Sequence, residues 1–262
     1  MSEKRTIRDY LLLNGIEVSG LKNPNMVLNK KALGLGKSDK RFAFRKFDVI
    51  DTEEKAYWLG FIFADGWVSS DGFNFELGLQ AKDVGHLHKF NRFMECEDNN
   101  VKYHPKITET KTYDSYRWAM KSEHLWKALN NLGCVPKKSL ILDFPKESIF
   151  KDPSLIRHFI RGYWDGDGCL CFTQNTHIVS VLGTKKFLIG LKKYVPNLQK
   201  ANIYKRQNIY SIQKSCKSAY DILAYLYQDS SIHLDRKYEK YLDFCRVYGE
   251  PCILLETQNG EG

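Results

Sequence analysis

Apolar and polar residues alternate strictly between positions 73 and 80 of this 262-residue chain. Phe73, Phe75, Leu77 and Leu79 point to one side of such a segment, and the polar residues between them point to the other. A period of two predicts a strand with one buried face and one polar face. The same alternation predicts further strands near residues 101–107, 116–121, 169–173, 177–182, 201–206 and 208–214.

Apolar spacings of three and four residues predict helices between these strands. The first helix begins near Asp51, with Glu54 in capping-box spacing, and another begins at Asp83, which is expected to cap it. Asp152 and Pro153 mark a further start, because proline suits the first turn of a helix. More helices are expected near residues 123–132, 184–194, 217–228 and 235–247. The order of helices and strands in the first half of the chain therefore repeats in the second.

Two of these helices end in the same short pattern. Residues 58–66 (WLGFIFADG) and 160–168 (IRGYWDGDG) are largely apolar, carry small residues four positions apart, and close on Asp-Gly. The small residues are Gly60 and Ala64 in the first copy, and Gly162 and Gly166 in the second. Small residues at this spacing lie on one helix face and let two backbones approach closely. If the two stripes pack on each other, the helices run side by side.

This arrangement brings Asp65 and Asp167 to adjacent helix C-termini. Each carboxylate then meets the negative end of a helix dipole and a second carboxylate, and hard divalent cations are the natural compensation. The glycines that follow, Gly66 and Gly168, are expected in the left-handed geometry common after helices. A single Asp-Gly fits an ordinary turn, but two copies on matching helices argue against that interpretation. A calcium-binding loop at the second copy fails, because Cys169 stands where a third oxygen ligand belongs.

The two motifs resemble those of the LAGLIDADG homing endonuclease family in its single-chain form, over about residues 48–247. The resemblance implies an α+β fold of two pseudo-symmetric αββαββα halves, residues 48–147 and 148–248, with the motif helices packed at their interface. Each half would carry an antiparallel, saddle-like sheet. The resemblance also implies a monomer that makes metal-dependent double-strand breaks in double-stranded DNA at a long, asymmetric target.

The resemblance further implies roles for residues at the ends of the motif helices. Asp65 and Asp167 match the acids that bind Mg²⁺ and cut one DNA strand each, with two or more divalent ions held between them. The main-chain carbonyls of Ala64 and Gly166, just before each acid, are implied as further metal ligands. The family does not need an acid two positions earlier, so Asp165 receives no role.

One basic residue per active site is also implied. Lys138 in Val-Pro-Lys-Lys-Ser and Lys237 in Leu-Asp-Arg-Lys-Tyr stand at the matching positions. Such residues polarise the water network or stabilise charge in the transition state. Lys137 and Arg236 lie beside them, so a shift of the motif match by one residue would give them the catalytic role instead. The alternative is that Lys138 and Lys237 are ordinary surface lysines near a turn.

The polar faces of the predicted sheets are left for a partner, and paired strands fit the major groove of DNA. In the first half the expected DNA contacts are Asn74, Glu76, Gln80, Lys102, His104, Lys106, Arg117 and Lys121. In the second half they are Arg206, Ser211 and Gln213. The phase of 201–206 stays open, because Ile203 and Tyr204 each fit the buried side. Any one of these residues fits ordinary solvent-facing polarity, so the prediction applies to the set.

Charge supports a polyanionic partner. The chain has a net charge of +9 and a pI near 9.0, and residues 1–45 hold ten Lys and Arg against four acids. We therefore predict a basic N-terminal extension at residues 1–47 and a short C-terminal tail at 249–262. Residues 6–14 resemble the second helix of a helix-turn-helix, and a simple docking helix fits them equally well.

Seven cysteines without a C-x-x-C pair argue against a zinc site and a disulfide framework. No apolar run approaches the length of a membrane span, and the N-terminus lacks the pattern of a signal peptide. We expect an intracellular, cytoplasmic protein of a bacterial or phage-infected host that is not secreted. An RNA maturase that assists intron splicing stays open as the alternative to an endonuclease, with intron RNA as its partner. The presence of both acids favours the endonuclease but does not exclude both functions.

Overall fold

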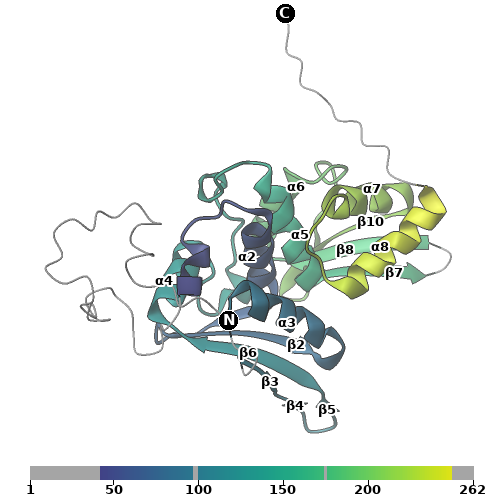
Figure 1. Cartoon of the computed structure of the whole chain (residues 1–262). Helices are drawn as coiled ribbons and strands as arrows, with labels where there is room; N and C mark the ends of the chain where they lie inside the picture. Colours follow the sequence, from purple (N-terminus) through teal and green to yellow (C-terminus); the bar gives the residue numbers. More distant parts are fainter. Residues whose placement is uncertain (1–41, 97–99, 174–175, 250–262) are drawn as a thin grey trace, which may run out of the picture. The chain divides into compact units, whose positions relative to one another are not determined.

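The computed structural model of the chain describes residues 42–96, 100–173 and 176–249. The helix predicted at 6–14 and residues 250–262 of the predicted tail lie outside the described residues. The first half consists of α2 (Glu53–Asp65), β1 (Gly66–Val68), β2 (Asn74–Gln80), α3 (Val84–Phe93), β3 (Val101–Tyr103), β6 (Ser115–Lys121) and α4 (Glu123–Asn131). Figure 1 colours the helices and strands by their position in the chain.

The second half repeats this order with seven elements of its own. They are α5 (Leu155–Asp167), β7 (Gly168–Thr173), β8 (Thr176–Gly183), α6 (Lys185–Lys192), β9 (Tyr204–Arg206), β10 (Ile209–Ser215) and α7 (Cys216–Tyr227), and α8 (Asp235–Tyr248) follows. The shorter elements are η1 (Phe42–Phe47), η2 (Ala81–Asp83), β4 (Lys106–Ile107), β5 (Thr112–Tyr113), η4 (Lys138–Leu140) and η5 (Glu147–Ile149). The predicted α+β fold of two αββαββα halves is confirmed.

Each half contains a four-stranded antiparallel sheet, in the order β1-β2-β6-β3 and β7-β8-β10-β9. Helices α3 and α4 contact the first sheet, and α6 and α7 contact the second. Buried and exposed residues alternate along the strands, as in β2, where Phe75 and Leu77 are fully buried. We call the side of each sheet that faces away from these helices its open face.

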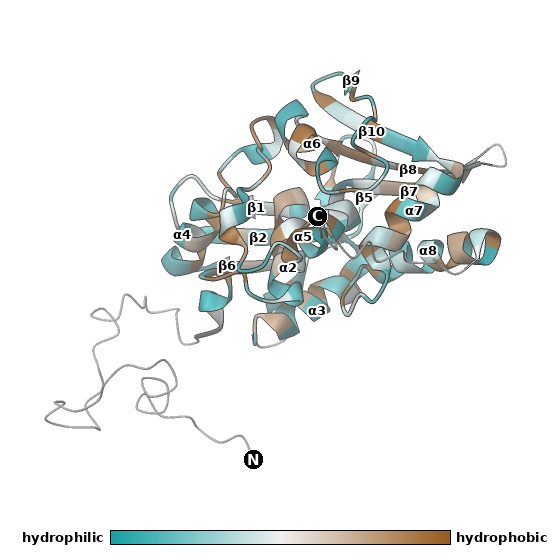
Figure 2. Ribbon diagram, turned by 90° about the horizontal axis from the view of Figure 1, so that it is seen from above, coloured by the Kyte–Doolittle hydropathy of each residue, from teal (hydrophilic) through white to brown (hydrophobic). Residues whose placement is uncertain are grey.

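The motif helices α2 and α5 pack against each other along the predicted stripe of small residues. An added Cβ at Gly60 would lie 1.9 Å from the carbonyl oxygen of Phe159, and one at Gly162 would lie 1.9 Å from that of Tyr57. A Cβ at Gly166 would lie 2.3 Å from Ala64 Cβ. The two backbones are therefore too close for any larger residue, and Figure 2 shows the helices side by side between the two sheets.

The helix starts differ from the predictions in two places. The N-cap of α2 is Thr52, whose Oγ1 accepts a hydrogen bond from the Lys55 amide at 3.3 Å, while Asp51 pairs with the Lys55 ammonium at 2.7 Å. Asp83 precedes α3 but its side chain makes no capping hydrogen bond. Its carboxylate instead accepts two hydrogen bonds from Arg236, each 3.0 Å long. A long-range ion pair therefore replaces the local cap.

Two predicted strands are shorter than expected. The segment 101–107 divides into β3 and β4 around Pro105, which has no N–H to donate to a sheet. The segment 201–206 contains only the three residues of β9, in which Tyr204 is 50% exposed and the preceding Ile203 packs against the core. This settles the phase that the sequence left open.

The end of the predicted basic extension is part of the folded core. Residues 42–47 form η1, and Phe44 and Phe47 are buried among the side chains of the first half. The prediction of an extension rested on the basic composition of residues 1–47, which gives no sign that Phe44 and Phe47 belong to the core. Among the described residues, no helix has the length and apolarity needed to cross a membrane.

Candidate active site

Each motif helix ends at its acid, and a strand begins at the next residue. Gly66 and Gly168 have φ values of −74° and −87°, so both are extended and the expected left-handed geometry is wrong. Their lack of a side chain has a steric reason instead. An added Cβ at Gly66 would lie 2.6 Å from the Ile62 carbonyl oxygen, and one at Gly168 would lie 2.4 Å from that of Trp164. The chain can turn directly from helix to strand only without these Cβ atoms.

The charge of Asp167 reaches Asp65 and opposes its ionisation. Burial and, secondly, the charge of Asp167 raise the pKa of Asp65 from 3.8 to about 7. Burial also raises the pKa of Asp167, against a hydrogen bond from the Tyr163 hydroxyl and the positive charge of Lys138. Both carboxylates are therefore less stable as anions than in water, which is the condition that a bound cation relieves.

Lys138 and Lys237 are the basic residues that reach the helix ends. Lys138 is buried, and its ammonium donates to the carbonyl oxygens of Ala64 at 3.1 Å and Gly66 at 2.6 Å. The Lys237 ammonium donates to the carbonyl oxygens of Trp164 at 2.8 Å and Gly166 at 3.3 Å, and also to that of Gly168. Burial lowers the pKa of Lys237 to about 8.

The two lysines occupy equivalent places in the two halves. Lys137 beside the first is exposed, and Arg236 beside the second binds Asp83. The carbonyls predicted as metal ligands, those of Ala64 and Gly166, are the ones that these ammonium groups already contact. The carbonyl oxygens at both helix ends therefore form a place that attracts positive charge.

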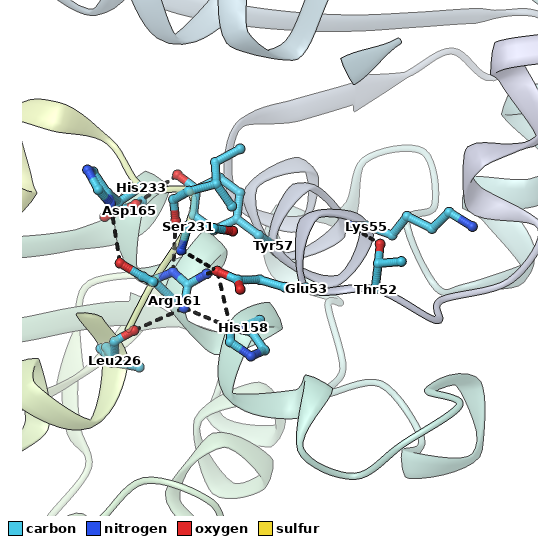
Figure 3. A network of polar contacts seen from close by, with 12 residues as sticks. Thr52, Glu53, Lys55, Tyr57, His158, Arg161, Asp165, Leu226, Ser231 and His233 are labelled. Atoms are coloured by element: carbon cyan, nitrogen blue, oxygen red, sulfur yellow. Dashed lines mark hydrogen bonds and ion pairs between the residues drawn. The ribbon is translucent and has the colours of Figure 1, made fainter. Parts of the chain in front are cut away.

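Asp165, which received no role from the sequence, is buried and belongs to a polar network beside the site, part of which Figure 3 shows. Its carboxylate accepts hydrogen bonds from the Tyr57 hydroxyl and the Leu234 amide, each at 2.8 Å, and from the Tyr227 hydroxyl. Tyr57 lies on α2, whereas Tyr227 and Leu234 flank the segment that leads into α8. Asp165 therefore links both halves to the helix that carries Lys237.

A second buried pair joins the motif helices near the start of α2. The Arg161 guanidinium is fully buried and donates to Glu53 at 2.6 Å, to the Ile232 carbonyl at 3.0 Å and to the Leu226 carbonyl at 3.1 Å. Glu53 also accepts the Ser231 amide at 2.8 Å. The positions 102 residues before Arg161 and Asp165 are the apolar Leu59 and Phe63, so these networks occur on one side of the helix pair only.

Comparisons with known proteins gave structural matches alone. No protein-family model matches the sequence, and no curated protein sequence matches it. Similar solved structures include I-SmaMI bound to uncleaved DNA in the presence of calcium ions (13% identity, 73% of this chain and 89% of that chain, TM-score 0.45). The LAGLIDADG meganucleases I-AabMI and I-CpaMI, each bound to uncleaved DNA, are similar at 17% identity, with 73% of this chain, 88% and 90% of theirs, and TM-scores of 0.45.

This chain resembles LAGLIDADG homing endonucleases. The resemblance is carried by its two motifs and by the tight packing of the helices that bear them. Among the described residues, no group of three or more His, Cys, Asp or Glu side chains is placed to hold a metal ion.

The expected DNA contacts of the first LAGLIDADG half lie mostly on one open face. Cross-strand pairs place Glu76 beside Ala119, Gly78 beside Arg117 and Arg117 beside Lys102. Arg117 contacts Glu76 at 2.9 Å and His104 at 2.7 Å, so its guanidinium is held in place before any partner arrives. The other expected DNA contacts of this half are Asn74, Gln80 and Lys121 on the same sheet, and Lys106 on the β4–β5 hairpin.

The expected contacts of the second LAGLIDADG half are fewer and less accessible. Gln213 is exposed on β10, but Ser211 is buried, and its hydroxyl accepts a hydrogen bond from Arg206 Nε at 3.2 Å. Arg206 is itself exposed on the edge strand β9. All eleven DNA contacts stay predictions, with Ser211 the member that the fold exposes least.

Proposed function

We propose that this chain is a site-specific DNA endonuclease that makes double-strand breaks with the help of divalent metal ions. The observation that carries the proposal is the placement of Asp65 and Asp167, two interacting carboxylates at the ends of tightly packed helices. Burial opposes the ionisation of both acids, the charge of Asp167 also opposes that of Asp65, and acids perturbed in this way are typical of functional sites. Packing alone does not require either carboxylate.

The residues at the helix ends fit Mg²⁺. The side chains of Asp65 and Asp167 and the carbonyls of Ala64 and Gly166 form an all-oxygen donor set, which is the type that hard cations prefer. Both carbonyls already accept hydrogen bonds from an ammonium group. Two or more divalent ions bound there would neutralise charge at the scissile phosphate and supply Lewis acidity.

The remaining residues bind the duplex and hold charge near the reacting phosphates. Lys138 and Lys237 keep a buried positive charge beside each acid, where it stabilises the additional negative charge of the transition state. Each lysine contacts the end of one motif helix only, so each is expected to serve one DNA strand. Both acids belong to one chain, so a monomer suffices for a double-strand break.

The open faces of the two sheets are proposed to lie in the major groove on either side of the acids. Lysines there would contact phosphates, and Arg117, Gln80 and Gln213 would contact base edges. An RNA maturase needs no strained carboxylate pair, so the cost of keeping Asp65 and Asp167 together favours the endonuclease. Because the two faces differ in sequence, the target is expected to be asymmetric.

A cleavage selection tests this function without knowledge of the target. The full chain is incubated with Mg²⁺ and a library of randomised duplexes, and the ends that it produces are captured and sequenced. We expect one long asymmetric sequence to be enriched, and the enrichment to vanish for Asp65→Asn, for Asp167→Asn and on chelation of the metal.

Asp229→Asn is the matched control, because Asp229 is exposed in a turn with φ of 54°, which asparagine tolerates. This variant should cut as the wild type does. Cleavage that survives in both active-site variants, or no enrichment by the wild type, would refute the proposed function.

A further inference from the structure

The two open faces can be compared residue by residue, because each sheet begins directly after an acid. Gly66 follows Asp65 and Gly168 follows Asp167, so Trp67 on β1 matches Cys169 on β7. The antiparallel registers carry this match across each sheet: Trp67 pairs with Glu76, and Cys169 pairs with Ser180. Matched positions therefore lie at the same distance from the acids in the two halves.

Charged residues of the first open face are matched by uncharged residues in the second. Glu76, Arg117 and Lys102 are matched by Ser180, Ser211 and Tyr204. The sole charged side chain on the second face, within the part of the chain that the structure describes, is Arg206 on the edge strand. Hydrogen bonding to base edges by charged groups is therefore confined largely to the first face.

Two large side chains with apolar surface, Leu182 and Tyr204, lie exposed on the second face. Leu182 and Tyr204 stand on either side of Ser211 in one cross-strand row and are 40% and 50% exposed. Gly78, which matches Leu182, carries no side chain. Ile178 is partly exposed two rows away, beside Cys171, and Ser180 and Gln213 occupy the row between. Exposed apolar side chains grouped on an uncovered sheet mark a surface that meets a partner.

We propose, on the basis of the endonuclease function above, that the second open face recognises thymine methyl groups in the major groove. The methyl group is the one apolar feature that a base pair presents there, and apolar side chains contact it. Arg206 and Lys205 lie exposed at the edge of this face, where basic groups can hold the phosphate backbone. An apolar centre with a basic edge fits a thymine-rich half-site, with its methyl groups and anionic backbone, better than a basic or an uncharged partner.

The two half-sites are then recognised by different chemistry. Arg117, held between Glu76 and His104, presents a fixed guanidinium suited to the two acceptors of guanine. Leu182 and Tyr204 instead exclude water from around methyl groups, and this contact needs no hydrogen bond to the base. Sequence preference in the second half-site therefore depends on an atom group that can be removed from DNA without changing base pairing.

The test replaces thymine by deoxyuridine, which lacks only the methyl group. The duplex obtained from the cleavage selection is prepared with deoxyuridine in one half-site at a time. Binding by the full-length Asp65→Asn/Asp167→Asn double variant is then measured. We expect each replacement in the second half-site to weaken binding about fourfold, the change associated with one buried methyl-sized group. Replacement in the first half-site should change binding less than twofold.

Two variants assign the half-sites. Leu182→Ser should remove most of the deoxyuridine effect, and because Leu182 is exposed the protein should still fold. Arg117→Ser gives the first face the residue that the second has at the matched position. This control should weaken binding and relax preference in the first half-site while the deoxyuridine effect in the other persists.

The outcomes separate this inference from the proposed function. Equal responses of the two half-sites, or an undiminished response with Leu182→Ser, would overturn the methyl recognition while leaving the endonuclease in place, and the apolar face would then serve another partner. Failure of the library to yield any cleaved sequence would instead count against the endonuclease itself.

Discussion

Replacing Asp65 by asparagine should abolish cleavage and stabilise the metal-free protein. The carboxylate is half-buried at a helix C-terminus, and burial together with the charge of Asp167 raises its pKa from 3.8 to about 7. Because the folded state holds the proton more tightly than the unfolded state, wild-type stability is complete below about pH 4 and is lost as the pH rises through about 7. Asparagine does not titrate, so the variant escapes this loss.

The size of the effect follows from the same shift. A difference of about three pH units between the two states corresponds to about 4 kcal/mol at 1.36 kcal/mol per unit. Solvent screening of a half-buried group reduces this to about 2 kcal/mol. The attraction of Asp65 to Lys138 and Lys237 is already included in the net upward shift. For a domain of this size, about 2 kcal/mol raises the melting temperature by about 4–8 °C.

Thermal unfolding of wild type and Asp65→Asn in the presence of a chelator, from pH 4 to pH 8.5, measures this directly. The stabilisation should be small at pH 4, grow as the pH rises, and level off above about pH 7. Excess Mg²⁺ should then stabilise the wild type and leave the variant unchanged, because a ligand stabilises only the state that binds it. A variant less stable than wild type at every pH would refute the claim that the acid pair is strained.

Three further changes test the parts that position the site. Gly60→Ala should destabilise the fold by about 3 kcal/mol in urea unfolding, because its Cβ would lie 1.9 Å from a carbonyl oxygen of the partner helix. The control Gly85→Ala, where the added Cβ meets open space, should change the stability by less than about 1 kcal/mol. Asp165→Asn should cost about 3 kcal/mol, because Oδ2 accepts hydrogen bonds from both the Tyr57 hydroxyl and the Leu234 amide while Oδ1 accepts from Tyr227, and an amide NH2 in place of one oxygen would face donors. An unchanged urea midpoint would contradict that role. Lys138→Met and Lys237→Met should each slow cleavage of one strand by roughly 10²-fold. With a strand-labelled duplex, the two variants should therefore accumulate nicks in opposite strands. Equal slowing of both strands would show that each lysine does not serve one strand alone.

Local sequence patterns predicted the features that depend on near neighbours. The alternation at 73–80 corresponds to β2, and the spacing of Gly60 and Gly162 anticipated the close approach of α2 and α5. The lysine positions implied by the resemblance, Lys138 and Lys237, are the ones that the fold buries at the helix ends. The first two signals are patterns within one element, whereas the lysines lie 74 and 73 residues from the carbonyls that they contact and were found only through the resemblance.

Features that depend on distant partners were missed. Asp165 is held by Tyr57, 108 positions before it, and Asp83 binds Arg236, 153 positions after it. No periodicity connects such residues, so Asp165 received no role and Asp83 was taken as a helix cap. The steric need for glycine at 66 and 168 likewise depends on how the strand leaves the helix, whereas the position of these glycines directly after a helix suggested left-handed turns.

The convergence of two carboxylates on shared cations is best tested by crystals of the chain with its selected duplex and Mn²⁺ in place of Mg²⁺. Anomalous scattering should place manganese in contact with both residue 65 and residue 167, with the Ala64 and Gly166 carbonyls released from their lysines. Manganese bound elsewhere, or at one carboxylate with the other facing neither metal nor phosphate, would contradict the account.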